Sequence, residues 1–279
     1  MRVWFITGAS RGFGALITRE ALAAGDAVVA TARDPKSVAE SFGANPNLLA
    51  VKLDVTQESG ARAAAEAAVA HFGHIDVLLN NAGFGLLGAV EEATAEEIAR
   101  LYATNVFGLL AVTRAVLPHM RARRAGHVIN ISSIGGYAAS PGWGVYCSTK
   151  FAVEGLTEAL AAELKPLGIH ATVVEPGFFR TDFLDARSLS TSPHAIADYS
   201  ATAGAMRDHA RAANHAQPGD PAKLAKSMLK LVGMAEPPLR MPFGSDTVRR
   251  IEEKNASVAK ELARVRELAL STDFAAAAE

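Results

Sequence analysis

The chain has 279 residues, of which 49% are hydrophobic and 20% charged, and its formal net charge is -1. This composition provides a large apolar core and excludes a wholly disordered protein. The near-zero charge offers no global attraction to nucleic acid or an anionic membrane, and no run approaches the ~20 apolar residues of a spanning helix. Because Cys147 is the only cysteine, no internal disulfide can form. We expect a cytoplasmic protein that acts on small molecules, without nucleic-acid or membrane partners.

Short apolar runs alternate along the chain with longer segments of helical periodicity. The predicted strands are residues 3–6, 27–30, 48–51, 77–79, 127–131 and 171–174, and the segments of helical pattern are 17–24, 58–72, 96–121 and 149–167. Continuous apolar runs are typical of parallel strands that are covered on both faces. The alternation predicts an α/β fold in one domain over residues 1–279. We expect a doubly wound, Rossmann-type parallel sheet of about seven strands with helices on both faces, a three-layer sandwich.

The last third of the chain differs in composition. Residues 183–221 are polar, rich in Ala, Ser and His, and only weakly periodic, and the segment they open extends over residues 183–236. They predict a loop-and-helix segment that covers a substrate site, and a simple surface insertion fits almost as well. Residues 239–241 are a candidate last strand. A C-terminal helix is predicted over residues 244–270, where one stripe contains Val248, Ile251, Val258, Leu262, Val265 and Leu268. Packing of this helix on its own domain is favoured over a contact between subunits.

Three glycines follow the first predicted strand and open a helix. They are Gly8, Gly12 and Gly14, in the segment Thr7-Gly8-Ala9-Ser10-Arg11-Gly12-Phe13-Gly14. Glycines at such a turn let the backbone approach a pyrophosphate, which sits at the helix N-terminus. The triplet alone is weak evidence, because an ordinary strand-to-helix turn has the same composition. Its place after the first strand of a βαβ pattern favours a dinucleotide site.

The end of the second strand bears on the choice between NAD and NADP. An acidic residue there binds the ribose 2′-hydroxyl, whereas arginine accepts a 2′-phosphate. Asp34 lies at the right spacing for the ribose, but Asp34 followed by Pro35 is typical of a helix N-cap and first turn. That local role leaves Arg33 and Arg11 as a cationic pair, although both can also be solvated surface residues. The sequence therefore favours NADP(H).

Tyr146 and Lys150 are four residues apart, which places them on one face of a helix. A phenol with an ordinary pKa of about 10 is a poor acid-base catalyst at neutral pH, and a nearby ammonium favours the phenolate. Ser133 lies thirteen residues earlier, at the end of a predicted strand, where its hydroxyl can orient a carbonyl. Each feature alone also fits a surface helix or an ordinary turn.

Together these motifs resemble the short-chain dehydrogenase/reductase family, in its compact form of about 250 residues. The residues that carry the resemblance are Thr7, Gly8, Gly12, Gly14, Asp54, Asn80, Asn81, Ala82, Gly83, Asn105, Ser133, Tyr146, Lys150, Pro176 and Gly177, in that order, and it covers residues 1 to 182. The resemblance implies that Tyr146 exchanges the proton and Ser133 hydrogen-bonds the reacting oxygen. It also implies that Lys150 lowers the tyrosine pKa and holds the ribose, while Asn105 supports a proton relay through water.

The resemblance also implies a set of binding residues. The expected cofactor contacts are Gly8, Ser10, Arg11, Gly12, Phe13, Gly14, Arg33, Asp54, Val55, Asn81, Ala82, Gly83, Tyr146, Lys150, Pro176, Gly177, Phe179 and Thr181. Ala32 occupies the position that is acidic in NAD-preferring members, which agrees with NADP(H). An apolar substrate pocket is predicted from Ser133, Gly135, Tyr137, Trp143, Tyr146, Phe178, Phe183 and Leu184. The family often forms dimers or tetramers, so a homodimer or homotetramer is expected.

Other chemistry has little support in the sequence. His71 and His74 are the only close histidine pair, which fits a solvated helix end better than a metal site. Cys147 has no histidine partner pattern of a nucleophile. Two alternatives to a carbonyl reductase remain: a regulatory or scaffold protein that binds NADP(H) without turnover, and an epimerase or dehydratase on the same fold. An intact Ser133, Tyr146 and Lys150 favours catalysis over binding alone.

Overall fold

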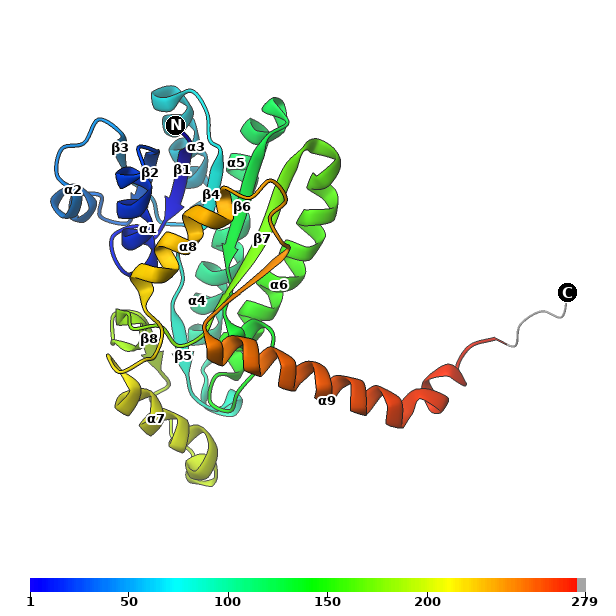
Figure 1. Cartoon of the computed structure of the whole chain (residues 1–279). Helices are drawn as coiled ribbons and strands as arrows, with labels where there is room; N and C mark the ends of the chain where they lie inside the picture. The colour runs from blue at the N-terminus through cyan, green and yellow to red at the C-terminus, as the bar shows by residue number, and fades with distance from the viewer. Residues whose placement is uncertain (275–279) are drawn as a thin grey trace, which may run out of the picture.

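A parallel sheet of seven strands forms the centre of the molecule (Figure 1), and the computed structural model describes residues 1–274. The strands, in their order across the sheet, are β3 (Leu48–Lys52), β2 (Ala27–Ala32), β1 (Val3–Thr7), β4 (Val77–Asn80), β6 (Gly126–Ile131), β7 (Ile169–Pro176) and β9 (Arg240–Phe243). Every pair of neighbours is parallel. The predicted doubly wound, Rossmann-type sandwich is confirmed.

Two layers of helices cover the sheet, which explains why its strands are continuously apolar. On one face lie α3 (Glu58–Phe72), α5 (Leu109–Arg123) and α6 (Gly144–Leu164), and on the other α1 (Gly12–Ala23), α2 (Lys36–Phe42) and α8 (Pro221–Val232). Along β1, Val3 and Phe5 enter the first core while Trp4 and Ile6 enter the second. Successive strand side chains point to opposite faces, so both faces of β1 must be apolar.

The remaining elements surround the sandwich. They are α4 (Ala95–Tyr102), α7 (Ala205–Ala213), α9 (Ser245–Leu270), a small parallel pair of β5 (Gly85–Leu87) with β8 (Leu189–Thr191), the 3-10 turns η1 (Val90–Glu92), η3 (Ile134–Gly136), η4 (Lys165–Leu167), η5 (Asp182–Leu184) and η6 (Ala197–Tyr199), and the π-helical segments η2 (Ala103–Gly108) and η7 (Ser200–Gly204). The helix predicted over residues 96–121 is thus α4, η2 and α5 in one run.

That run, Ala95–Arg123, is the one described helix long and apolar enough to cross a membrane by length and composition. Its α5 part packs against the sheet, where Val112, Val116 and Met120 are fully buried. Core packing therefore accounts for its apolar character.

Two expectations for the last third of the chain need correction. The predicted covering segment, residues 183–236, ends in α8, whose Leu224 and Met228 pack in the sandwich beside α1 rather than over a site. The C-terminal helix forms as predicted, but the expectation that it packs on its own domain is wrong for most of its length. Only its first turns contact the body, and α9 then projects away from it (Figure 1). Leu262 and Leu268 are 53% and 74% exposed.

A buried carboxylate holds the segment between β8 and α7 to the body. The Glu92 carboxylate accepts hydrogen bonds from the amides of Ala89, at 2.6 Å, and Ile196, at 2.9 Å, and forms an ion pair with Arg207 of α7. Burial opposes ionisation, but these two amides and Arg207 outweigh it and lower the pKa of Glu92 below its ordinary value. The ion pair therefore fixes a segment that has little regular structure of its own.

We predict that Arg207→Ala destabilises the fold by about 3 kcal/mol, because it leaves the Glu92 charge buried without its partner. Urea unfolding followed by tryptophan fluorescence at neutral pH measures the loss. Arg211→Ala is the matched control, since Arg211 pairs with Asp208 on the exposed face of the same helix, and it should change stability by less than about 0.5 kcal/mol. Equal stabilities for the two variants would contradict the prediction.

Candidate active site

A large cavity, of about 1200 Å³, lies at the carboxyl ends of the central strands. Its walls come from the glycine loop after β1, the loops after β2, β3, β4, β6 and β7, the start of α6, and segments near residues 182–190. Ligands of open α/β sheets bind at this end of the strands, because the loops there diverge to the two helical layers.

The glycine loop forms one wall and is shaped for close backbone approach. Gly8 and Gly12 have φ of +66° and +55°, in the left-handed region that favours glycine. A Cβ at Gly14 would lie closer than 3.0 Å to both the Gly8 carbonyl and the Asn81 amide. Gly14 was predicted to contact the cofactor, but it packs beneath the loop and does not line the cavity. Arg11 precedes α1 without a side-chain cap, so the first-turn amides of α1 remain available to an anion.

Hydrogen bonds join the glycine loop to the loop after β4. The Thr7 hydroxyl accepts from the amides of Asn81, at 2.9 Å, and Ala82, at 3.0 Å. The Asn81 side chain donates in turn to the carbonyls of Thr7 and Gly8. The neighbouring Asn80 is buried and donates to Asn130 and Thr113 instead. The Asn-Asn-Ala-Gly segment is thus a brace between two loops.

The end of β2 presents a cation to the cavity. Arg33 is exposed and lines it, while Asp34 does not. The Asp34 carboxylate accepts from the Lys36 amide at 3.0 Å, so it is engaged at the start of α2, although the N-cap position falls on Pro35, one residue later than predicted. Arg11 also lines the cavity and donates through Nη2 to the Arg187 carbonyl at 2.7 Å.

The candidate catalytic pair lies in the first turns of α6. Tyr146 and Lys150 are both buried, and Lys150 Nζ lies 5.8 Å from the centre of the Tyr146 ring. Lys150 donates to the carbonyl of Ile131, the last residue of β6, at 2.8 Å. Ser133 follows β6 and lines the same part of the cavity, and its hydroxyl accepts from the Gly135 amide at 3.1 Å. The structure thus brings together the three residues that the sequence singled out.

Burial controls the ionisation of both groups. It raises the pKa of Tyr146 above its ordinary value, which the hydrogen bond with Ser133 opposes and Cys147 reinforces. Burial lowers the pKa of Lys150 to about 8, and the Glu154 carboxylate opposes that shift. The Tyr146 phenol therefore keeps its proton at neutral pH, and the pKa of the Lys150 ammonium lies close to neutral.

An apolar wall faces the phenol. Trp143 meets the Tyr146 ring edge-on at 5.6 Å and stacks on Phe183 at 6.5 Å. Gly135, Phe178 and Leu184 also line the cavity, as predicted. Tyr137 was wrongly placed there. Its hydroxyl donates instead to Asn255 of α9 at 2.5 Å.

Comparison with known proteins identifies the family. A sequence model of the short chain dehydrogenases matches residues 2–191. The 3-ketodihydrosphingosine reductase of Bacteroides thetaiotaomicron is 39% identical over 247 residues, which cover 87% of this chain and 88% of that protein. A short-chain dehydrogenase from Streptomyces avermitilis is also 39% identical, with a TM-score of 0.91 over 98% of this chain and 100% of the other.

The chain belongs to the short-chain dehydrogenase family.

It is therefore an oxidoreductase of that family, and solved relatives contain either nicotinamide cofactor. A short-chain dehydrogenase/reductase from Burkholderia phymatum, 25% identical with a TM-score of 0.81 over 93% of this chain and 95% of that one, is in complex with NAD. A gluconate 5-dehydrogenase from Burkholderia cenocepacia, 33% identical with a TM-score of 0.62 over 66% and 74%, is in complex with NADP and tartrate. The glycine cradle and uncapped helix start fit the pyrophosphate of such a cofactor.

Asn105 of this dehydrogenase lies behind the cavity wall rather than on it. Its side chain exchanges hydrogen bonds with the backbone of Phe84, at 2.9 and 3.1 Å, and donates to Thr149 at 3.3 Å. A Cβ at Gly83 would lie 3.2 Å from its carbonyl oxygen. Asn105 thus holds the loop after β4 to α6 from within the π-helical segment η2.

Several lining residues escaped the sequence analysis. They are Arg100, Asp182, Arg187, His209 and Gln217, with Asp246, Arg249, Arg250 and Glu253 from the start of α9. Gln217 is only 2% exposed, and neither atom of its amide has a hydrogen-bond partner within the described part of the chain. No local pattern marks these residues, because distant segments bring them to the cavity.

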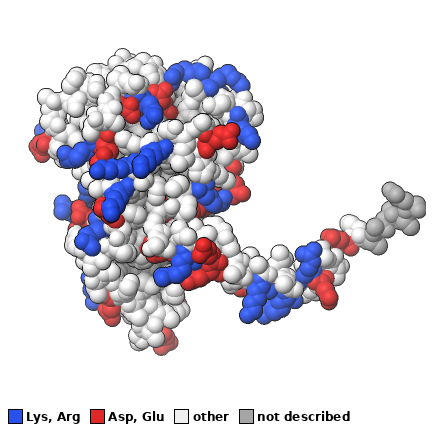
Figure 2. All heavy atoms as spheres, in the orientation of Figure 1, with Lys and Arg blue, Asp and Glu red and all other residues white. Residues whose placement is uncertain are grey.

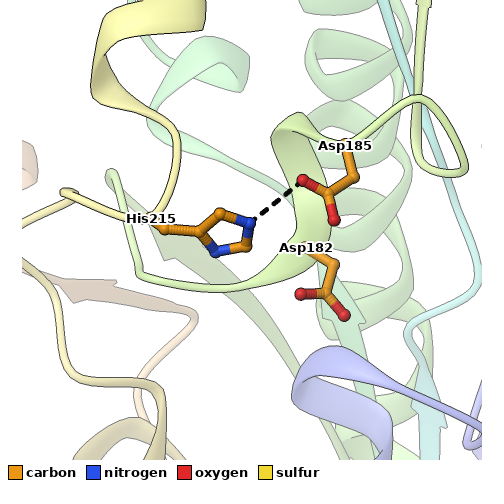
Figure 3. Close-up of side chains that lie close together, drawn as sticks. All are labelled: Asp182, Asp185 and His215. Atoms are coloured by element: carbon orange, nitrogen blue, oxygen red, sulfur yellow. Dashed lines mark ion pairs between the residues drawn. The ribbon is translucent and has the colours of Figure 1, made fainter.

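Two aspartates and a histidine lie together near the cavity mouth (Figure 3). Ligand atoms of Asp182, Asp185 and His215 are all within 4.8 Å of one another, a spacing that a metal ion tolerates. Asp185 already pairs with His215 at 3.2 Å and accepts from Asn214 at 2.7 Å. The hydrogen bond from Asn214 is the largest influence that lowers the pKa of Asp185. These contacts tie the loop at η5 to the segment after α7.

A buried pair of carboxyl groups lies behind Lys150. Glu154 of α6 and Glu175 of β7 are 5% and 0% exposed, and Arg240 Nε lies 3.5 and 3.6 Å from their oxygens. Burial raises the pKa of Glu175 to about 8, the negative charge of Glu154 adds to the rise, and Arg240 opposes it. One guanidinium serves two buried carboxyl groups, so the pair retains a proton at neutral pH.

This pair predicts a pH-dependent stability. The folded protein keeps a proton on Glu175 that the unfolded chain loses. The stabilisation that comes from this proton is complete below the ordinary glutamate pKa of 4.5, and it is lost as the pH rises through about 8. Wild-type protein should lose about 2 kcal/mol across this window, an amount discounted for solvent screening. Glu175→Gln is neutral at every pH and should flatten the slope.

Urea unfolding at a series of pH values measures both slopes. Glu158→Gln is the control, because that exposed carboxylate also pairs with Arg240, at 3.1 Å, but keeps its access to water. If the free energy of unfolding depended on pH in the same way for wild type and both variants, the Glu175 proton would not control stability.

Proposed function

We propose that this short-chain dehydrogenase interconverts a carbonyl and an alcohol with NADP(H), with Tyr146 as the general acid and base. The observation that carries the proposal is the buried Tyr146 beside Ser133 and Lys150, which faces an apolar wall at the end of a cavity shaped for a dinucleotide. A protein that only binds the cofactor has no need of such a proton-transfer group. An epimerase or dehydratase on this fold is the second alternative.

Backbone and side chains on four loops would hold the cofactor. The first-turn amides of α1 with Ser10, Gly12 and Phe13 suit the pyrophosphate, and Asp54 with Val55 suits the adenine side. Asn81, Ala82 and Gly83 would line its centre, while Pro176, Gly177, Phe179 and Thr181 would lie beside the nicotinamide. When bound, the reduced nicotinamide supplies the hydride.

The residues of this chain supply and steer the proton. In the reductive direction a substrate oxygen gains a proton as its carbon gains the hydride, so the donor must be neutral beforehand. The burial that raises the pKa of Tyr146 keeps it so. Ser133 would hold the same oxygen and stabilise its developing charge, and Lys150 would balance the phenolate that remains. Asn105 supports the relay from behind by positioning the Phe84 backbone and the Thr149 hydroxyl.

Two arginines favour NADP(H) over NAD(H). Arg33 lines the cavity at the end of β2, a position at which an acidic residue would bind the ribose hydroxyl of NAD. Arg11 lies in the glycine loop and lines the same cavity. The nearby Asp34 is engaged with the Lys36 amide. Guanidinium groups bind a 2′-phosphate bidentately, whereas a ribose hydroxyl offers them no charge.

The proposed substrate is an apolar ketone or aldehyde. Trp143, Phe178, Phe183 and Leu184 offer the substrate end of the cavity mainly hydrocarbon surface. The Bacteroides relative is named for reduction of 3-ketodihydrosphingosine, which supports a ketone. We further propose a cytoplasmic homodimer or homotetramer, supported by Phe107 and Phe151, which are 62% and 45% exposed on neighbouring helices.

We predict that Tyr146→Phe lowers kcat for carbonyl reduction at least about 100-fold, the usual contribution of a positioned proton donor. NADPH oxidation with a panel of apolar ketones and aldehydes measures the rate, and cofactor binding by fluorescence should stay within about threefold of wild type. Tyr199→Phe removes a phenol bound to Glu91 on the surface and is the control. Retention of full reducing activity by Tyr146→Phe would overturn the mechanism. Racemised or dehydrated products without net NADPH oxidation would favour the epimerase or dehydratase.

We predict that Arg33→Ala combined with Arg11→Ala weakens NADPH binding about 10- to 100-fold, as expected for losing charged hydrogen bonds of about 1.5–3 kcal/mol. NADH binding should change less than about threefold. Arg62→Ala, an exposed arginine of α3 away from the cavity, is the control. Equal losses for both cofactors, measured by titration calorimetry, would refute the NADP(H) preference.

A further inference from the structure

Lys150 is a buried ammonium that is held by a neutral group. It is 7% exposed, and its one hydrogen bond within the described residues goes to the Ile131 carbonyl, at 2.8 Å. Gly83, whose backbone also lies beside the ammonium, is neutral too. A carbonyl dipole replaces only part of the solvation that a cation loses on burial. The charged form of Lys150 therefore depends on charges that do not touch it.

The surface of the molecule does not supply that balance. Basic and acidic side chains are interspersed on the face that Figure 2 shows, and the formal net charge of the chain is -1. Such a surface produces no strong field of either sign, and water and salt screen what remains. The charges that decide the ionisation of Lys150 are therefore the buried ones.

The titratable and charged groups around and behind Lys150 come from three elements of the sandwich. They are Tyr146, Cys147 and Glu154 of α6, Glu175 of β7 and Arg240 of β9. Burial raises the pKa of the Tyr146 phenol and of the Cys147 thiol, so both groups stay neutral at neutral pH. Of this set, only the two carboxyl groups can supply a negative charge.

The negative charge of the pair lies on Glu154 and its proton on Glu175. Burial raises the pKa of both groups, and for Glu175 the negative charge of Glu154 adds to the rise. The protonated Glu175 can donate a hydrogen bond to Glu154, and the Ser132 hydroxyl and Arg240 also favour the ionised form of Glu154. Glu154 lies one helical turn beyond Lys150, so its charge is on the same side of α6 as the ammonium.

Arg240 makes a buried carboxylate tolerable at this place. Its Nε lies 3.5 Å from Glu154 and 3.6 Å from Glu175, and its Nη2 donates to the exposed Glu158 at 3.1 Å. A guanidinium at this distance offsets part of the cost of burying the charge of Glu154. The charge beside Lys150 thus depends on β9, which joins the sheet near the end of the chain.

None of Glu154, Glu175 and Arg240 lines the cavity. We propose that Glu154 is a positioning residue of this site: its buried carboxylate holds Lys150 in the charged form, while Glu175 and Arg240 hold Glu154 in its own charged form. Coulomb attraction across one helical turn is strong where little water is present to weaken it. The functional consequence rests on the proposed function, in which a charged Lys150 balances the phenolate of Tyr146.

The direct test is the titration of Lys150 in the full chain without cofactor or substrate. Lysines labelled with carbon-13 at Cε report their protonation by NMR, and the Lys150 signal is the one that is missing from Lys150→Met. The pKa of Lys150 in wild type should be about 8. Glu154→Gln should lower that midpoint by at least about 0.5 pH unit, because one negative charge a helical turn away is lost.

Glu175→Gln is the matched control within the same buried cluster. It replaces a carboxyl group that is already neutral below about pH 8, so it should move the Lys150 midpoint less than half as far as Glu154→Gln. In the double variant Glu175 can no longer take over the lost charge, so the shift should be larger than in Glu154→Gln. Glu158→Gln removes the exposed partner of Arg240 and should leave the midpoint unchanged. Should Glu154→Gln not fold, Glu154→Met removes the same charge with an apolar side chain of similar size.

An unmoved Lys150 midpoint in the folded Glu154 variant would overturn the proposal. So would an equal shift in Glu175→Gln, because any change in the buried cluster would then have the same effect. A shift in Glu154→Gln that Glu154→Asp largely reverses would support it, since aspartate keeps the charge.

The pH profile of carbonyl reduction separates this inference from the proposed function. Since Lys150 balances the phenolate there, the alkaline limb of kcat should move to lower pH in Glu154→Gln, by the shift that the titration gives. KM for the ketone should stay within about threefold of wild type, and a merely structural defect would lower kcat equally at every pH. A titration that shifts while the alkaline limb stays in place would support the inference about Glu154 and overturn the proposed role of Lys150 in the reaction.

Discussion

The hydrogen bond from Lys150 to the carbonyl of Ile131 joins the active-site helix to the central strand β6. A buried ammonium requires such a partner, because an unpaired charge away from water is costly. Tyr146 lies one turn before Lys150, and Ser133 follows Ile131 by two residues. This one contact therefore fixes the distance between the helix that provides the phenol and the strand end that provides the hydroxyl. The remaining loops are arranged around that fixed point.

The charge balance behind this contact explains how a lysine can stay buried there. Glu154 lies one turn beyond Lys150 and opposes the effect of burial on its pKa. Glu154 in turn shares Arg240 with Glu175, so charge is distributed over two strands and a helix. Such a network makes the ionisation of Lys150 depend on the packing of Arg240 and Glu175 behind it. The ammonium is then sensitive to residues that never touch a ligand.

The floor and the outer wall of the cavity are built differently. The floor comes from strand ends and α6, which belong to the continuous cores of the sandwich. The wall comes from the 182–190 segment, α7 and α9, which are held by polar contacts, such as Glu92 with Arg207 and Asp246 with Phe178, and by a smaller apolar cluster that includes Leu189 and Ala210. Under the proposed function, chemistry is placed on the sandwich, while substrate selection is placed on segments that tolerate change.

The sequence by itself determined the sandwich, since parallel strands covered on both faces need continuous apolar runs that are visible without a structure. It also indicated the engagement of Asp34 at the start of a helix and most cavity-lining motif residues, because glycine, proline and capping signals act over a few residues. Tertiary structure decided the rest. β7 extends from Ile169 to Pro176 because its first residues pair with β6 and its last residues, Val173 to Pro176, pair with β9, a strand far along the chain. Tyr137 turns to Asn255, Asn105 and Gly14 pack behind the cavity wall, and Gln217 enters the cavity, all through contacts between distant segments. The apolar stripe of α9 was evident from its periodicity, but only the path of the helix showed that its own domain leaves it uncovered.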